Sequence, residues 1–437
     1  MIRLKKILFA FFMVILFIPV LQQNVNFIDV RKLDGAFHAH GNPKFYIKEL
    51  FNGSFQKKYE SFINDNFGFR NTFVRLHNQI QYSVFGKSTA EDVIVGKNGY
   101  LYEEKYITAL QGKDFIGEEK INSIISKLKF LQDTLQKINI TLVPVFAPSK
   151  ARFFPEYIPE RYKIDKNAKT NYDYFIKACK QQQVEFIDFN DLFIKSKDTS
   201  RYPLYPKCGT HWSVYSFINA TDSLKRYIEK KRNIKLNNII YTGVEISDSL
   251  HDPDCDMGKA LNLFSVPEHY SMAYPKYYFE NNSYKIRPKV LTIADSYYYG
   301  IFMTRIPKFI FSYGGFWYYY KQVFPKVNNV TPDINDIDVH SEILKQDVIF
   351  IMNTECNLNY FSSGFIDDAY VMFKYGMDYY RQIKDSLDYE KEVIIMEKNI
   401  KGQKEWFEKV KKQARDLNRS IDEMLRENAE YMLRDKK

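Results

Sequence analysis

Cysteine is scarce in this sequence, and its spacing is not that of a metal site. The 437 residues include only four cysteines, and none of them forms a CxxC pair. Closely paired cysteines are typical of zinc sites and redox motifs, so neither is indicated, and the wide spacing does not establish a disulfide framework. We therefore expect four buried or free thiols, and neither a metal ion nor an organic cofactor. The four are Cys179, Cys208, Cys255 and Cys356.

Patterns typical of nucleic-acid-binding proteins are also absent. The formal net charge of +10 favours an anionic partner, which would be an acidic polymer, a membrane surface or a nucleic acid. Because the chain has no Gly-rich, RGG-like or zinc-finger pattern, nucleic acid is the least favoured of the three. Internal repeats and low-complexity linkers are absent too, so the length fits one large domain with elaborations or two domains.

The N-terminus carries an export or anchoring pattern. Three basic residues within the first six positions precede an apolar run from Ile7 to Leu21. Such a segment is a signal peptide or a signal anchor, and a buried core helix is the alternative. Polar residues follow at 22–24 in place of a small-x-small cleavage site. We therefore expect an uncleaved anchor over residues 1–25, with the rest of the chain on the extracytoplasmic side of the inner membrane.

Helical patterns alternate with short apolar strands from about residue 118 onward. Helices are expected over 118–135, over 168–182 and after Ser213, the last with Ser213 as its N-cap. This alternation predicts an α/β fold with a mainly parallel sheet and helices on both faces, whose sites lie at the carboxyl ends of strands. The expected strands are Thr141–Phe146, Val184–Ile187, Val290–Ala294, Asp347–Met352 and Glu392–Met396.

Two further segments complete the expected organisation. An Asn-Gly turn within Val93–Tyr102 predicts a β-hairpin ahead of the alternating region. Apolar residues at helical spacing over Gln403–Leu433 predict a charged amphipathic helix. We expect one extracytoplasmic α/β domain over residues 26–400, with the amphipathic helix of residues 401–437 docked on it.

A serine and a histidine are the candidate reactive residues. Ser296 follows the strand Val290–Ala294, where a hydroxyl is presented close to backbone N–H groups that can stabilise an oxyanion. His211 lies just before a predicted helix, and a neutral imidazole there can accept the serine proton. The alternatives are a helix-capping serine and a structural histidine.

Four short motifs follow one another along the chain: Asn66–Asn71; Val95–Tyr102; Pro148–Lys150 leading into Phe154–Glu156; and Gly209–Ser213 followed by Ala294–Ser296. Their order resembles the SGNH-hydrolase-like O-acetyltransferases of the alginate acetylation AlgX/AlgJ type. The resemblance covers most of residues 60–370, and it implies an exported or anchored protein that moves acetyl groups onto exopolysaccharide hydroxyls through a Ser-His-Asp triad. It also implies a multipass membrane acyltransferase as the acetyl donor.

The sequence departs from that family at the residue expected to orient the histidine. The family has Asp two positions before the catalytic histidine, whereas this chain has Gly209. Losing such a carboxylate can lower the rate by about 10⁴-fold in serine proteases. Three outcomes are therefore open: another carboxylate orients the histidine, the serine and histidine act as a dyad, or the protein is inactive. Glu355 and Asp295 are the expected substitutes, Glu355 slightly ahead, while Asn353 is a candidate oxyanion donor or a turn residue.

Two charged groups have open interpretations. Lys150 and Arg152, at the end of the strand from Thr141, are candidates for binding an anionic substrate, with a solvated basic loop as the alternative. The aspartates at 252, 254 and 256 superficially suggest a calcium loop. EF-hand spacing and its closing Glu are absent, so a polar surface turn is expected.

Two functions follow from these observations. The first is a membrane-anchored O-acetyltransferase or acetyl esterase that acts on polysaccharide through Ser296 and His211. The second is a catalytically silent scaffold that binds polysaccharide or partners in an assembly or export complex, and Gly209 is its main support.

Overall fold

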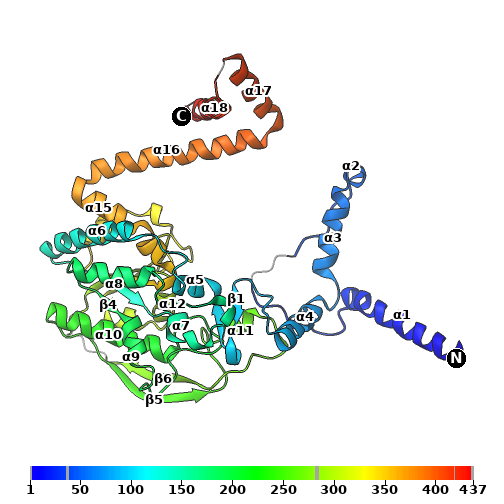
Figure 1. The fold of residues 1–437 in the computed structure, drawn as a ribbon, viewed down its shortest axis with the longest axis horizontal. Helices are drawn as coiled ribbons and strands as arrows, with labels where there is room; N and C mark the ends of the chain where they lie inside the picture. The colour runs from blue at the N-terminus through cyan, green and yellow to red at the C-terminus, as the bar shows by residue number, and fades with distance from the viewer. Residues whose placement is uncertain (1, 36–38, 281–284, 418, 435–437) are drawn as a thin grey trace.

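The structure is a computed structural model that describes residues 2–35, 39–280, 285–417 and 419–434 (Figure 1). A central α/β body carries one helical arm before it in the chain and another after it. The α/β body holds the candidate site.

One six-stranded sheet forms the centre of the body. Its strand order is β4-β3-β10-β7-β8-β9, in which all neighbours are parallel except the antiparallel pair β8 and β9. The expected mainly parallel α/β fold is therefore confirmed. The strands are β3 (Thr141–Ala147), β4 (Ile187–Asp188), β7 (Lys289–Ala294), β8 (Tyr313–Tyr318), β9 (Gln322–Phe324) and β10 (Val348–Thr354).

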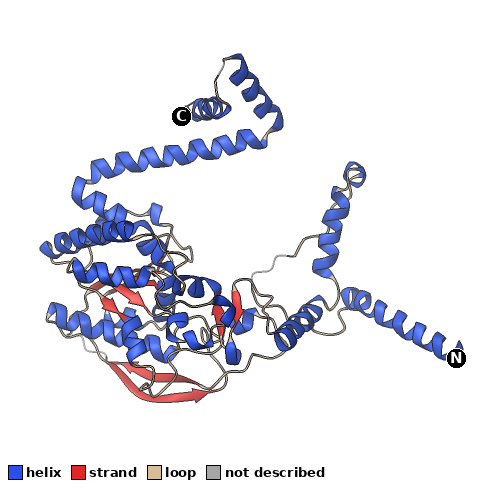
Figure 2. Ribbon diagram, in the orientation of Figure 1, coloured by secondary structure: helices blue, strands red, loops and turns tan. Residues whose placement is uncertain are grey.

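Helices cover both faces of this sheet (Figure 2). Alternate residues of the central strands enter two separate cores: Val145 and Phe350 lie in one, and Leu142 and Ile351 in the other. A parallel sheet buried on both faces explains why β3, β7 and β10 are nearly continuous apolar runs. The first core contains residues of α5 (Glu104–Leu110), α7 (Lys150–Phe153), α9 (Phe189–Lys195), α10 (Val214–Arg232), α12 (Ser296–Met303) and α13 (Ile306–Ile310); the second contains residues of α6 (Glu118–Lys137), α8 (Asn171–Gln181), α14 (Val339–Leu344) and α15 (Phe365–Tyr375).

The strand expected at Val184–Ile187 is shorter than predicted and displaced towards its C-terminal end. Only Ile187 and Asp188 pair with β3. The backbone N–H of Val184 donates to Cys179 at the end of α8, and that of Glu185 donates to the Gln132 side chain. The backbone N–H groups of Val184 and Glu185 therefore donate to groups outside the sheet, so only two residues of this segment pair with β3.

Two antiparallel hairpins lie outside the sheet. The one predicted around Asn98 is present as β1 (Val93–Val95) and β2 (Leu101–Glu103), with the 3-10 turn η1 (Lys97–Gly99) between them. The second, which was not predicted, pairs β5 (Ile239–Ser247) with β6 (Met272–Phe279). The short helix α11 (Asp256–Ala260) lies between these two strands in sequence and belongs to the candidate site.

The N-terminal arm begins with α1 (Ile2–Val25), whose side chains are mostly exposed. Among the described residues, one helix, Arg3–Val25, is long and apolar enough to cross a membrane, and a signal sequence has the same character. Gly68 lies between α3 (Ser54–Asn66) and α4 (Arg70–Phe85) and packs against α1, where a Cβ on it would lie 1.9 Å from the carbonyl oxygen of Pro19. Glycine is thus required for this approach. The arm continues through α2 (Ile47–Phe51), α3 (Ser54–Asn66) and α4 (Arg70–Phe85).

The C-terminal arm differs from two expectations. Glu392–Met396 is helical within α16 (Met377–Gly402), because Val393, Met396 and Ile400 form an apolar stripe at helical spacing. A short apolar run alone does not distinguish a strand from such a stripe. The expected single helix over Gln403–Leu433 is two helices, α17 (Lys404–Asp416) and α18 (Ile421–Arg434).

These last helices pack on one another and on α16 instead of docking on the α/β domain as expected. Their shared apolar cluster contains residues from α16, α17 and α18 only. The α/β cores end with α15 and the first residues of α16, so residues 390–434 form a separate three-helix unit, and residues 435–437 lie outside the described part of the chain. Its buried members are Val393, Met396, Ile400, Val410, Ala414, Met424, Leu425 and Ala429.

Candidate active site

His211 is fixed by the residues that follow it. The Ser213 side chain caps α10 by accepting a hydrogen bond from the Ser216 backbone N–H, as predicted. The buried Trp212 donates from its indole Nε1 to the carbonyl of Tyr297, at 3.2 Å. These contacts tie the histidine loop to the start of α12.

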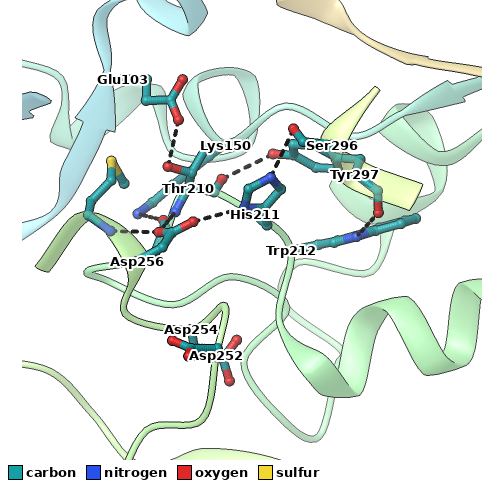
Figure 3. Close-up of polar contacts among 12 residues, drawn as sticks. Glu103, Lys150, Thr210, His211, Trp212, Asp252, Asp254, Asp256, Ser296 and Tyr297 are labelled. Carbon is teal, nitrogen blue, oxygen red and sulfur yellow. Dashed lines mark hydrogen bonds and ion pairs between the residues drawn. The ribbon is translucent and has the colours of Figure 1, made fainter. Parts of the chain in front are cut away.

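Ser296 is the first residue of α12, directly after β7. The Asp295 side chain caps this helix by accepting from the Tyr297 backbone N–H, at 3.0 Å. The chain therefore turns sharply from strand to helix at the serine, as the sequence predicts. The distance from Ser296 Oγ to His211 Nε2 is 3.0 Å, so the two candidate residues meet (Figure 3).

The carboxylate on the other side of the imidazole belongs to Asp256. Its Oδ2 lies 2.9 Å from His211 Nδ1, while its Oδ1 accepts from the backbone N–H of Thr210 at 2.7 Å (Figure 3). One oxygen therefore faces the ring and the other holds the loop that carries it. Ser296, His211 and Asp256 have the connectivity of a Ser-His-Asp triad.

The crowding around Gly209 shows why position 209 cannot carry the carboxylate that orients His211. A Cβ on this residue would lie 2.8 Å from the carbonyl oxygen of Pro253 and 2.9 Å from that of Asp254. No side chain fits there, because the segment that leads into Asp256 occupies the space. The same segment that excludes a side chain at position 209 thus brings a carboxylate to the histidine.

The aspartate segment is only partly the polar surface turn that was expected. Asp252 is exposed and pairs with Lys259 at 2.6 Å, whereas Asp254 is buried. Asp256 faces the site. The sequence shows aspartates at alternate positions in a short segment. This pattern does not indicate which of them contacts a histidine 45 positions earlier.

The predicted substitute Glu355 does not approach the histidine. It is buried and forms an ion pair with Arg152, at 3.0 Å between Nε and Oε2. The guanidinium also lies over the ring of Tyr172, at 4.5 Å. The two charges compensate each other inside the fold, so the predictions of Glu355 as the orienting acid and of Arg152 as a residue that binds an anionic substrate are both corrected.

Asp295 is also committed elsewhere. Its Oδ2 accepts from the backbone N–H of Thr354 at 2.7 Å, from the Thr354 hydroxyl at 2.8 Å and from Asn357 Nδ2 at 2.8 Å. It therefore joins the start of α12 to the end of β10. It positions Ser296 through the backbone and does not contact the imidazole.

Asn353 lies on the wrong face of the sheet for an oxyanion donor. Strand alternation places it with Ile349 and Ile351, in the core away from α12. Its Oδ1 accepts from the backbone N–H of Ser362 at 3.1 Å. The structure thus gives Asn353 the turn role that was its alternative.

Lys150 is buried behind the histidine loop and is not presented to solvent. Its Nζ donates to the carbonyl oxygens of Lys207 and Gly209, at 2.8 and 2.7 Å. Burial lowers the pKa of this lysine to about 7. Lys150 holds the backbone of the histidine loop through these two hydrogen bonds. It is therefore neither a substrate-binding residue nor part of a solvated basic loop.

A mostly apolar cavity of about 590 Å³ opens beside Ser296 and His211. Aromatic side chains from α12 and from the end of β8 form much of its wall. Tyr319, which follows β8, lies near the Ser296 side chain, and burial raises its pKa to about 12. The main apolar residues of the cavity are Trp212, Val214, Phe217, Tyr297, Tyr299 and Met303.

Metal-ligating side chains do not gather anywhere in the described part of the chain: no group of three or more His, Cys, Asp or Glu residues could hold an ion there.

Residues 93–285 match the family model described as "SGNH hydrolase-like domain, acetyltransferase AlgX". The resemblance seen in the sequence is confirmed. The matched range contains His211 and Asp256 and ends before Ser296, and the match supports an acyltransferase or esterase activity.

Distant likenesses to solved structures accompany this match. The O-acetyltransferase domain of Pseudomonas putida AlgJ is 15% identical with a TM-score of 0.42, covering 64% of this chain and 98% of that one. Pseudomonas aeruginosa AlgX is 14% identical with a TM-score of 0.41, covering 64% and 66%. Bacillus cereus PatB1 is 12% identical with a TM-score of 0.33, covering 55% and 91%. No curated protein matches the sequence.

Proposed function

We propose that this chain is an extracytoplasmic O-acetyltransferase or acetyl esterase that acts on hydroxyl groups of a cell-surface or exported polysaccharide. The observation that carries the proposal is the continuous contact from Asp256 through His211 to Ser296. The match to an acetyltransferase family supports the reaction class. Gly209 does not favour a silent scaffold, because the carboxylate of Asp256 reaches His211 from another segment.

The first half of the reaction forms an acyl-enzyme. Asp256 accepts a hydrogen bond from the Nδ1–H of His211, which leaves Nε2 free to take the hydroxyl proton of Ser296 as its oxygen attacks the acyl carbonyl. The backbone N–H of Ser296 stabilises the oxyanion, because the N–H of Tyr297 already donates to Asp295, and the Tyr319 side chain lies beside the serine. The imidazolium then gives its proton to the leaving group.

The second half returns the acyl group to an acceptor. A sugar hydroxyl, or water in the esterase reaction, loses its proton to His211 and attacks the acyl-serine carbonyl. The aromatic wall of the cavity offers faces on which a sugar ring can pack. The acetyl group would be delivered by a multipass membrane acyltransferase, and α1 would keep the site close to that donor as an uncleaved inner-membrane anchor.

Hydrolysis of p-nitrophenyl acetate tests the proposal. Ser296→Ala should abolish release of p-nitrophenol and labelling by a fluorophosphonate probe. Ser249→Ala, which changes an exposed serine outside the site, is the control and should leave both unchanged. If Ser296→Ala hydrolyses the ester as fast as the parent protein, the proposed mechanism is wrong.

A further inference from the structure

Two of the four cysteines face each other directly behind the candidate site. Cys208 Sγ and Cys255 Sγ are 3.0 Å apart, and both side chains are buried. Cys208 lies three residues before His211, and Cys255 immediately precedes Asp256. The pair therefore sits where the segment carrying the base meets the segment carrying the acid.

The backbones around the two sulfurs are already held together. The N–H of Gly258 donates to the carbonyl of Cys208 at 2.9 Å. A Cβ on Gly258 would lie 2.5 Å from Cys255 Sγ and 3.1 Å from Cys208 Cβ, so only glycine lets the segments approach this closely. Apolar residues enclose the pair, and the cluster includes Val93, Leu101, Met257, Leu261 and Leu263.

We propose that Cys208 and Cys255 form a disulfide in the mature protein, and that this bond is a positioning link that holds Asp256 on His211. An S–S bond is about 2.05 Å long, so the sulfurs need to approach by only about 1 Å, which small side-chain rotations supply. The extracytoplasmic placement on which this rests belongs to the proposed function, and such compartments maintain disulfides.

The chemistry requires an oxidant, which is the disulfide of a thiol-disulfide exchange protein or of oxidised glutathione. The Cys255 thiolate attacks one sulfur of that disulfide, forming a mixed disulfide and releasing one thiolate. Cys208 then loses its proton and attacks Cys255 Sγ, releasing the second thiol. Two electrons and two protons leave the cysteine pair and reduce the oxidant to two thiols.

Two features of the pair favour this order of events. Once the two segments have met, the hydrogen bond from the Cys208 thiol lowers the pKa of Cys255, which favours Cys255 as the attacking sulfur. Both sulfurs are buried in the folded protein, so exchange takes place after the segments meet and before the apolar cluster closes over them. The finished bond is then shielded from external thiols, as a structural rather than a labile disulfide.

Thiol counting on the parent protein tests the bond itself. The full-length chain, exported to an oxidising compartment, is denatured without reductant, titrated for thiols, alkylated and digested for mass spectrometry. Of the four cysteines, only Cys179 and Cys356 should react, and all four should react after reduction. A peptide pair joined through Cys208 and Cys255 should appear in the unreduced digest. Four reactive thiols before reduction would overturn the proposal.

Kinetics test the positioning role. The Cys208→Ala/Cys255→Ala double variant should hydrolyse p-nitrophenyl acetate with a kcat lowered at least about tenfold, at nearly constant KM, because a looser carboxylate orients the imidazole less well. Cys179→Ala, a buried cysteine in α8, is the matched control and should keep the parent kcat. An unchanged kcat in the double variant would overturn the positioning role.

The two proposals fail separately. A cross-linked parent protein that releases no p-nitrophenol contradicts the proposed function and leaves the disulfide standing. An active parent protein with four free thiols does the reverse. If the double variant does not fold, the mass measurement on the parent protein still decides the bond.

Discussion

Asp256 gives its two carboxylate oxygens different tasks, and this division decides what a substitution there should do. One oxygen faces His211, and the other holds the backbone of Thr210. An amide keeps the acceptor for the backbone but cannot stabilise the imidazolium. One carboxylate oxygen of Asp256 therefore fixes the conformation of the loop, and the other faces the imidazolium that forms in the reaction.

Asp256→Asn should lower kcat for p-nitrophenyl acetate by about 10⁴-fold, the loss seen when a triad aspartate loses its charge. Circular dichroism should show an unchanged fold, because the Thr210 contact persists. Asp252→Asn makes the same chemical change on an exposed residue of the same segment and should stay within about twofold of the parent. A loss of less than tenfold in Asp256→Asn would mean that another group orients His211.

Asp254 should make stability depend on pH. Burial raises the pKa of its carboxyl from the ordinary 3.8 to about 7, so between these values the folded chain binds a proton that the unfolded chain does not. Its contribution therefore lowers stability as pH rises from about 4 to 7, by at most about 1.4 kcal/mol per pH unit, and the penalty is complete above pH 7.

Thermal unfolding of Asp254→Asn at a series of pH values checks this. The variant should melt at a higher temperature than the parent at pH 8, and the difference should shrink or reverse at pH 4. Curves that run parallel from pH 4 to 8 would show that the ionisation of Asp254 does not contribute.

Single residues also show how far the sequence alone could go. Ser296 and His211 were predictable because each stands at a recognisable boundary, one after a strand and one before a capped helix. Asp256 was not, because it lies neither at a strand end nor two positions before the histidine. Its position depends on how the 252–256 segment packs on Gly209, which is a contact between distant parts of the chain.

At the scale of elements, the three C-terminal helices form a core of their own. Val410 is fully buried among residues of α16 and α18, while its neighbour Lys409 is exposed. A charged group at the buried position has no partner and is costly, whereas at the exposed position it remains in water.

Val410→Asp should therefore unfold the three-helix unit and leave the α/β domain intact. Limited proteolysis should cut the variant within residues 390–434, while hydrolysis of p-nitrophenyl acetate stays at the parent rate. Lys409→Asp is the control for the added negative charge and should resist the protease like the parent. If Val410→Asp also abolishes hydrolysis, the helical unit supports the catalytic domain.

Long elements were predictable and short ones less so. The helix over Glu118–Lys137 has six buried positions that repeat at helical spacing, which few other structures explain. The five apolar-rich residues Glu392–Met396 fit a strand equally well, and only packing against α17 and α18 makes them helical. The antiparallel pair β5 and β6 escaped prediction because much of its surface is exposed and its pattern is weak.

At the scale of the whole molecule, the apolar α1 approaches the turn between α3 and α4 closely. Gly68 lies against the carbonyl of Pro19, so the end of α1 is tied to the turn between α3 and α4. The sequence predicts an anchored α/β protein, and the fold class is confirmed. The arrangement of its arms was not predictable, because it depends on such isolated backbone contacts.

The full-length chain should sediment with membranes and remain there after a wash with 1 M salt. Such salt shortens the Debye length to about 3 Å and screens the attraction between surface charges. A chain that begins at Asn26 should be released into the soluble fraction. The salt wash is needed because the net charge of +10 could hold the protein on an anionic surface without an anchor. Mass spectrometry of the mature N-terminus adds a direct check, since loss of the first 20 to 25 residues would show a cleaved signal sequence.

The space around Gly209 restricts how such a site can change over generations. An aspartate at position 209 and the closed 252–256 segment exclude each other, because both would occupy the same volume. An aspartate at position 209 therefore requires the 252–256 segment to lie elsewhere, and Asp256 would then not reach His211, so the two acids are alternatives to each other.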